Sequence, residues 1–250
     1  MYLNEVNIIY YVIIGVIGLF MGQLVDWMCV RLPEYKKVFS KDIITEYKKE
    51  FKPNYIMIII NAILYIALLY RFGVADTFIG NLDLLKFLIL TPMLLSAFVI
   101  DYRLQIIPNR LNLTIFEVGL VFVFIYGISN IAISINMFLG MLVGGGIFLL
   151  ITLIGGLLYG KEAMGLGDVK FMGALGLFFG LESIISISLV SFLIGAVLSI
   201  ILLATKIKKT DEYIPFGPFI VIATFIQMFV PFSIMFEILV TIFTLGLSNR

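Results

Sequence analysis

The sequence predicts an all-α, polytopic membrane protein of about eight transmembrane helices. Of its 250 residues, 62% are hydrophobic and only 13% are charged, whereas a soluble domain is nearer half apolar and a quarter charged. The apolar residues form long runs, and a membrane-spanning helix needs about 20 of them in succession. We expect helices because backbone groups in lipid must form their hydrogen bonds within the segment itself.

Polar stretches separate the apolar runs and set the expected boundaries of each span. The spans are expected at about residues 6–30, 55–70, 84–100, 113–128, 136–159, 168–180, 183–205 and 213–230. The tail at 231–250 is apolar but contains Glu237. Two interpretations stay open for this tail, a short ninth span or an interfacial helix.

The distribution of Lys and Arg predicts which loops face the cytoplasm. With the N-terminus outside, the loops expected inside hold all but three of the 17 basic residues, the exceptions being Arg71, Lys86 and Arg250. Cytoplasmic loops of membrane proteins carry such an excess. The first of these loops, at 31–54, is strongly basic. Asp101 and Asp168 then both fall at the cytoplasmic ends of their spans.

Several kinds of catalysis are excluded by composition. The chain has no histidine, which removes Ser-His-Asp and Cys-His catalysis and the HExxH metalloprotease motif. It has one cysteine, Cys29, which removes a disulfide within the chain and a cysteine-cluster zinc site. If the protein is a hydrolase, aspartates or a Ser-Lys pair are the groups that remain.

Asp101 and Asp168 are the candidate catalytic residues. A carboxylate in or beside a membrane segment is costly and indicates a functional site. Two carboxylates about 3 Å apart that share a proton can hydrolyse a peptide, one as base toward water and the other as acid toward the carbonyl oxygen. Gly165 and Gly167 are expected to let the backbone turn sharply before Asp168. The alternative for Asp168 alone is a helix cap after a glycine-rich loop.

Four stretches of the chain resemble a known family. Asp101 with Ile107-Pro108-Asn109 resembles the region of that family's first catalytic aspartate, and Gly165-Leu166-Gly167-Asp168-Val169-Lys170 resembles the GxGDxK motif around the second. Ile214-Pro215-Phe216-Gly217-Pro218-Phe219 resembles its Pro-Phe-Gly-Pro stretch, and the segment from Gly22 to Pro33 resembles its N-terminal motif. In this order and spacing, the chain resembles the type IV prepilin peptidases, membrane aspartic proteases of the GxGD class.

The resemblance implies an activity, a substrate and a location. It implies an endopeptidase of a cell's inner membrane with its aspartates at the cytoplasmic face. Its substrates would be type IV prepilins or pseudopilins, which have a short basic leader before an apolar helix. The lipid bilayer is the other expected partner, and no nucleic acid is expected. Proteolysis would need no cofactor, whereas methylation of the new N-terminus, found in many members, would use S-adenosylmethionine.

The resemblance also divides the chain and assigns supporting residues. We expect an N-terminal membrane region at 1–72, a protease core at 84–230 and the apolar tail at 231–250. The residues expected to support the site are Pro108, Asn109, Gly165, Gly167, Lys170, Pro215, Phe216, Gly217 and Pro218. By itself, the stretch from Pro215 to Pro218 predicts a helix-start turn, and Lys170 is as consistent with a solvated base as with a countercharge to Asp168.

Two departures from the family pattern affect zinc and methylation. The loop at 31–54 lacks the paired cysteines that bacterial members carry, so we expect no bound metal. Gln23 and Asp26 replace the family's Ser and Asn in the N-terminal motif, which puts methyl transfer in doubt.

Two rival functions stay open. One is a presenilin-like intramembrane protease, although Ile100 rather than Tyr precedes Asp101, and the other is a small proton-coupled transporter.

Overall fold

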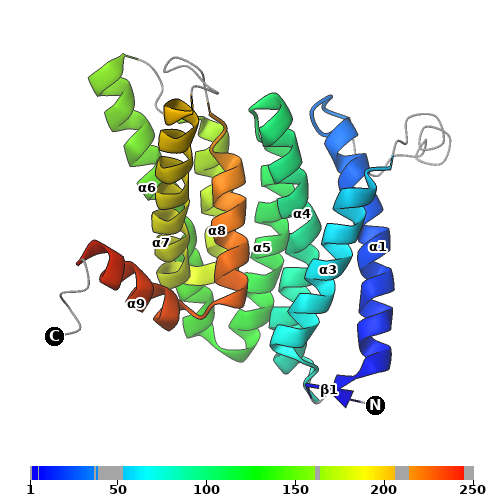
Figure 1. Ribbon diagram of the computed structural model, residues 1–250. Coiled ribbons are helices and arrows are strands. Elements are labelled where there is room, and N and C mark those ends of the chain that lie inside the picture. Colours follow the sequence, from blue (N-terminus) through cyan, green and yellow to red (C-terminus); the bar gives the residue numbers. More distant parts are fainter. Residues whose placement is uncertain are drawn as a thin grey trace. The chain divides into compact units, whose positions relative to one another are not determined.

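The computed structural model describes residues 2–4, 6–36, 38, 53–160, 164–205 and 214–244. Nearly all of this part of the chain is helical (Figure 1), which confirms the expected fold class. The chain forms two compact units, one of residues 1–104 with 108–111 and the other of residues 105–107 with 112–250. Most of the predicted basic loop, residues 37 and 39–52, lies outside the described residues.

The first unit is built from three long apolar helices. These are α1 (Ile8–Arg31), α3 (Tyr55–Phe72) and α4 (Leu82–Leu104), with the short 3-10 helix η1 (Ile79–Asn81) leading into α4. A two-residue strand pair, β1 (Tyr2–Leu3) and β2 (Val6–Asn7), precedes α1. The backbones of α1 and α3 lie close together because Gly18 and Gly22 face Ala62 and Ile58. The buried Asn61 side chain donates a hydrogen bond to the Gly18 carbonyl at 2.7 Å.

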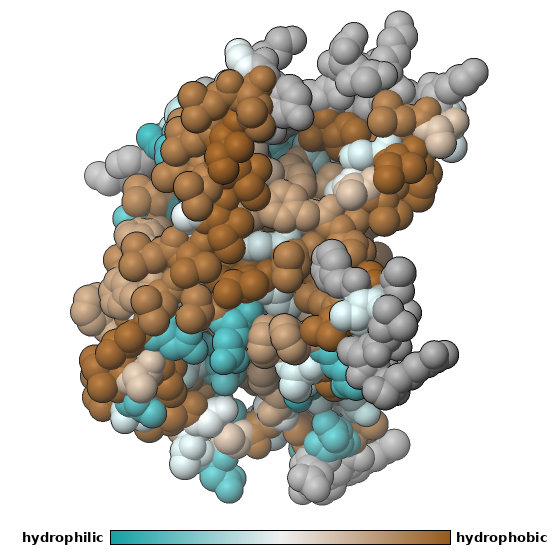
Figure 2. All heavy atoms as spheres, turned by 90° about the vertical axis from the view of Figure 1, so that its left-hand side faces the viewer, coloured by the Kyte–Doolittle hydropathy of each residue, from teal (hydrophilic) through white to brown (hydrophobic). Residues whose placement is uncertain are grey.

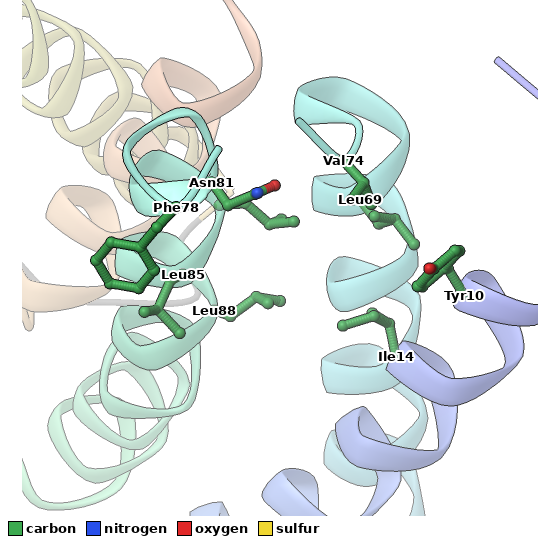
Figure 3. Close-up of a pocket in the computed structure, with 9 residues that line it drawn as sticks. Tyr10, Ile14, Leu69, Val74, Phe78, Asn81, Leu85 and Leu88 are labelled. Atoms are coloured by element: carbon green, nitrogen blue, oxygen red, sulfur yellow. The ribbon is translucent and has the colours of Figure 1, made fainter. Parts of the chain in front are cut away.

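An apolar pocket of about 270 Å³ lies near the N-terminal ends of α1 and α4. Figure 3 shows Leu85 and Leu88 on one side of it, with Leu69, Ile14 and Tyr10 on the other. No charged side chain lines it among the described residues. It therefore has none of the acid-base groups that a hydrolytic site needs.

The second unit contains the remaining helices. They are α5 (Asn109–Ser129), whose first turn is counted with the first unit, α6 (Ile131–Tyr159), α7 (Leu166–Ala204), α8 (Gly217–Phe229) and α9 (Phe232–Phe243). Figure 2 views the side on which α6 and α9 lie in Figure 1, and apolar side chains cover most of that face. Such a surface suits a lipid environment, since a soluble monomer rarely exposes large contiguous apolar patches.

Helix α7 accounts for two of the predicted spans because it is broken at Gly180. A straight helix of its 39 residues would measure about 58 Å, nearly twice the hydrocarbon thickness of a bilayer. Gly180 has φ 74° and ψ −177°, which favours glycine. The Leu181 amide that follows donates to the Asn136 side chain at 2.8 Å, which caps the second part. Figure 1 shows the two parts running in opposite directions, as the two predicted spans require.

The two C-terminal helices are shorter than a bilayer crossing. Among the described residues, six helices are long and apolar enough to cross a membrane, and α8 and α9 are not among them. Within residues 214–230 of the predicted span, the helix begins only at Gly217. Pro215 disfavours helical geometry in Ile214 before it, whereas Pro218 lies in the first turn of the helix, where proline is tolerated. With 12 residues, α9 measures about 18 Å and does not cross a bilayer within its own length. This favours the interfacial interpretation of the tail.

Close packing between α6 and the first part of α7 depends on glycine. A Cβ atom at Gly140 would lie 2.6 Å from the Gly176 carbonyl oxygen, and one at Gly176 would overlap the Gly140 backbone. Gly140-x3-Gly144 and Gly176-x3-Gly180 are small-xxx-small spacings, which allow helix backbones to approach this closely. A Cβ atom at Gly144 would lie 2.8 Å from the Met172 carbonyl oxygen and 2.7 Å from the Ile184 side chain, so both parts of α7 pack against α6.

We predict that Gly176→Ala destabilises the protein, because its added methyl group would overlap backbone atoms that cannot rotate away. Overpacking of this kind costs about 1–3 kcal/mol. Gly146→Ala is the matched control, since a Cβ atom there would have no neighbour within 4 Å in the part of the chain that the structure describes. Thermal unfolding in detergent should show a lower Tm for Gly176→Ala and a value near wild type for Gly146→Ala. Equal melting temperatures for the two variants would contradict this account of the packing.

Candidate active site

Asp101 lies in the last turn of α4, the most deeply buried of the long helices of the first unit. The residue is 3% exposed, and Ile100 beside it is 2% exposed. The helix ends at Leu104, and Gln105 follows with a left-handed φ of 57°. A residue in this conformation closes many helices. The chain therefore holds a buried carboxylate at the C-terminal end of an apolar helix, at the helix end that the sequence predicted.

Pro108 and Asn109, two of the predicted supporting residues, form the start of α5. Pro108 is buried, and its carbonyl accepts a hydrogen bond from the Leu111 amide at 3.0 Å. Asn109 is the first residue of the helix and is exposed. Because a proline disfavours helical geometry in the residue before it, α4 and α5 cannot merge into one helix. The role visible for Pro108 is thus to separate the two helices.

Asp168 lies in the first turn of α7 and is 4% exposed. Its amide donates to the Gly165 carbonyl at 3.0 Å, which starts the helix. The first amides of a helix have no partner within the helix, so this end carries a partial positive charge. The second candidate carboxylate is therefore at the opposite kind of helix end from the first.

Gly165 and Gly167 are not needed for a sharp backbone turn, and this expectation was wrong. Gly165 has φ −69° and ψ 140°, which any residue adopts. Gly167 lies inside the first turn of α7. A Cβ atom at Gly165 would lie 3.5 Å from the Asp168 carboxylate, and one at Gly167 would lie 3.4 Å from the Ile107 carbonyl oxygen. These are ordinary van der Waals contacts, so a methyl group would fit at each position.

Asn112, which the sequence did not single out, fixes the backbone next to Asp168. It lies in the first turns of α5, is 4% exposed, and donates a hydrogen bond from Nδ2 to the Gly167 carbonyl at 3.0 Å. Its Oδ1 atom is buried and has no hydrogen-bond partner among the described residues. A buried amide is costly unless its hydrogen bonds are satisfied. The signal in the sequence was a polar residue between Leu111 and Leu113 in an apolar run.

The stretch from Pro215 to Pro218 is a helix start, as its own pattern predicted. Pro218 lies in the first turn of α8, which begins at Gly217. The Phe216 ring packs against Phe192 and Phe148, with centroids 5.1 and 5.9 Å away, and so fastens the start of α8 to α7 and α6. Lys170 is exposed near the start of α7, and its effect on Asp168 stays a prediction.

These residues fall into two groups according to unit. Asp168, Gly165, Gly167 and Asn112 lie together in the second unit, whereas Asp101, Pro108 and Asn109 belong to the first. That the two aspartates meet remains a prediction from the sequence. In the described part of the chain, no three His, Cys, Asp or Glu side chains come together as metal ligands. The expected absence of zinc also stays a prediction.

Comparison with known proteins identifies similar sequences. Three relatives named prepilin leader peptidase/N-methyltransferase come from Xanthomonas campestris, Aeromonas hydrophila and Legionella pneumophila, with 34%, 31% and 33% identity over 172, 156 and 152 residues. These matches cover 68%, 62% and 60% of this chain and 56%, 53% and 51% of the relatives. The chain thus spans about half the length of the relatives that it matches. No solved structure matches it.

The region that carries both aspartates also matches a protein family. Residues 88–200 match the type IV leader peptidase family. This range includes Asp101, the start of α5 with Asn112, and the first turn of α7 with Asp168. Residues 88–200 are thus the part of this chain that is similar to the type IV leader peptidase family.

Proposed function

We propose that this protein is a membrane aspartic endopeptidase in which Asp101 and Asp168 form the catalytic pair. The observation that carries the proposal is the burial of these two carboxylates, 3% and 4% exposed, at the ends of apolar helices. Burying two such groups in membrane helices is costly, so they are expected to have a function. Both lie in the region that matches the leader peptidase family.

The helix ends suggest which aspartate acts as base and which as acid. The N-terminal end of α7 stabilises a negative charge on Asp168, whereas the C-terminal end of α4 disfavours one on Asp101. In the proposed reaction, ionised Asp168 takes a proton from the attacking water. Protonated Asp101 donates its proton to the carbonyl oxygen of the scissile peptide, and the pair later protonates the departing amine.

The proposed substrates are prepilins or pseudopilins, in keeping with the names of the relatives. Such a substrate has a short basic leader followed by an apolar helix. The distribution of Lys and Arg supports a cytoplasmic position for both aspartates in the inner membrane. The leader would then stay in water while the apolar helix enters the bilayer. Cleavage would occur at the boundary between them.

S-adenosylmethionine is a proposed cofactor for a second reaction, N-methylation of the product. The relatives are named N-methyltransferases as well as peptidases. This cofactor supplies the methyl group, and its amino-acid end carries an ammonium and a carboxylate. Among the described residues, Asp26 and Arg103 line a common cavity and have the complementary charges. These two residues would hold the amino-acid end.

We predict that Asp101→Asn and Asp168→Asn each lower the rate of leader cleavage by at least about 100-fold. General acid-base catalysis contributes about 10²–10⁴-fold, and asparagine keeps the size of the side chain while removing its acid-base function. Cleavage of a prepilin-like peptide by purified protein in detergent is the measurement.

Glu117→Gln is the control, because Glu117 is an exposed acid within a predicted span. It should cleave at a rate near wild type, and all three variants should melt near the wild-type temperature. A folded Asp101→Asn or Asp168→Asn variant with near-normal turnover would refute the two-aspartate mechanism.

The position of the cut is the second prediction. We expect cleavage after the basic leader and before the apolar helix of the substrate, because the candidate carboxylates lie at helix ends rather than in mid-span. Mass spectrometry of both products gives the position directly. A cut inside the apolar helix would favour the presenilin-like alternative, and no cut with any prepilin-like substrate would favour the transporter.

The third prediction concerns Asn112 as a positioning residue for Asp168. Loss of its hydrogen bond to the Gly167 carbonyl in Asn112→Ala should lower kcat about fivefold, since one such bond contributes about 1 kcal/mol. KM should change little, because the bond orients a reacting group rather than the substrate. Leu113→Ala, at the neighbouring exposed position, is the control. A kcat unchanged in folded Asn112→Ala would remove this role.

A further inference from the structure

A second cavity in the first unit has a polar lining. It measures about 570 Å³ and lies at the C-terminal ends of α1 and α4, beside the start of α3. Small-molecule sites span about 300–1,000 Å³. The residues that line it are Asp26, Cys29, Val30, Pro53, Asn54, Tyr55, Ile56 and Arg103. The cavity therefore combines one carboxylate, one guanidinium and a partly apolar wall.

Among the described residues, the two charges in this lining use little of their hydrogen-bonding capacity. The Asp26 carboxylate accepts one hydrogen bond, from the Asn54 amide to Oδ2 at 2.6 Å. The Arg103 guanidinium is near enough to act electrostatically on Asp26. Among the described residues, however, the two form no ion pair within 4 Å. A carboxylate can accept several hydrogen bonds and a guanidinium can donate five, so both retain capacity for a ligand.

The place of Asp26 in the chain makes a purely structural role costly. It lies within α1, more than a turn before the helix ends at Arg31, in one of the helices apolar enough to span a membrane. A charged group at such a position indicates a functional site.

We propose that this cavity binds a zwitterionic group in which an ammonium and an acidic group share a short stem. The ammonium would bind to Asp26 and the acidic group to Arg103, while the uncharged part of the ligand would contact Val30, Ile56 and Tyr55. Hydrogen bonds to charged partners are about twice as strong as neutral ones, and a guanidinium can bind a carboxylate or phosphate through two of them.

Two ligands carry this chemistry. One is the amino-acid end of S-adenosylmethionine, and that version rests on the methylation part of the proposed function. The other is the head group of phosphatidylethanolamine, and this version does not depend on the methylation part of the proposed function. Arg103 follows Asp101 by two residues in the last turn of α4. A ligand in the cavity would therefore bind on the helix turn that also carries the proposed catalytic residue.

Binding can be measured on the full-length protein without any enzymatic readout. Titration calorimetry in detergent gives the affinity for S-adenosylmethionine, with methionine as competitor. Native mass spectrometry gives the retention of phosphatidylethanolamine against phosphatidylcholine, whose quaternary ammonium cannot donate a hydrogen bond. The variants are Asp26→Asn and Arg103→Gln. The matched controls are Glu117→Gln and Arg71→Gln, which remove one acid and one base elsewhere.

We expect at least one of the two ligands to bind to wild type and to lose at least tenfold in affinity in both cavity variants but in neither control. Competition by methionine would assign the site to the amino-acid end, and retention of phosphatidylethanolamine over phosphatidylcholine would assign it to the lipid. Failure of both to bind, or equal binding by all variants, would overturn the proposal. If Asp26→Asn lowers the affinity for the ligand and Arg103→Gln does not, the proposal that the ligand is zwitterionic would be overturned.

The same preparations separate this inference from the proposed proteolysis. Asp101→Asn should be inactive in leader cleavage yet bind the ligand as wild type does. If wild type cleaves the leader but binds neither ligand, the cavity proposal fails and the peptidase stands. If wild type binds the ligand through Asp26 and Arg103 but cleaves nothing, the peptidase proposal fails and the cavity proposal stands.

Discussion

The cost of burying carboxylates in apolar helices is the constraint on which this account depends. Asp101 and Asp168 are 3% and 4% exposed in helices built almost wholly from apolar residues. Each lies at a helix end, where the backbone offers unpaired polar groups. Because the ends are of opposite kinds, the two carboxylates are in different electrostatic environments. That difference suits a pair in which one member is charged and the other protonated.

Glycine contacts determine where the second of these helix ends can be. The close approach of Gly140 and Gly176 holds the first part of α7 against α6, and the break at Gly180 lets the second part return along α6. The first part is consequently short, and Asp168 begins it. At that beginning, Asn112 holds the Gly167 carbonyl from α5. The site in the second unit is thus supported by helix packing at one end of this segment and by a hydrogen bond at the other.

The positions of most helices could be predicted from the sequence, because apolar runs and the polar residues between them are features of neighbouring residues. The break in α7 falls at the boundary between the predicted spans 168–180 and 183–205, where Glu182 interrupts the apolar run two residues after Gly180. The cap that Asn136 provides there could not be predicted, since it joins residues that are distant in the chain. The hydrogen bond from Asn112 to Gly167 was missed for the same reason. At Gly165, the residue type suggested a sharp backbone turn, whereas the structure shows extended backbone angles that any residue adopts.

The central claim is that the aspartates of the two units meet in the membrane, and cross-linking tests it most directly. Asp101→Cys and Asp168→Cys would be combined in a chain with Cys29→Ser and treated with a short bifunctional thiol reagent. The control pairs Asp101→Cys with Glu182→Cys, about 20 Å further along α7 if that helix were straight. The account predicts rapid intramolecular cross-linking of the aspartate pair and little of the control. Equal rates, or no cross-link between the aspartate positions, would contradict it.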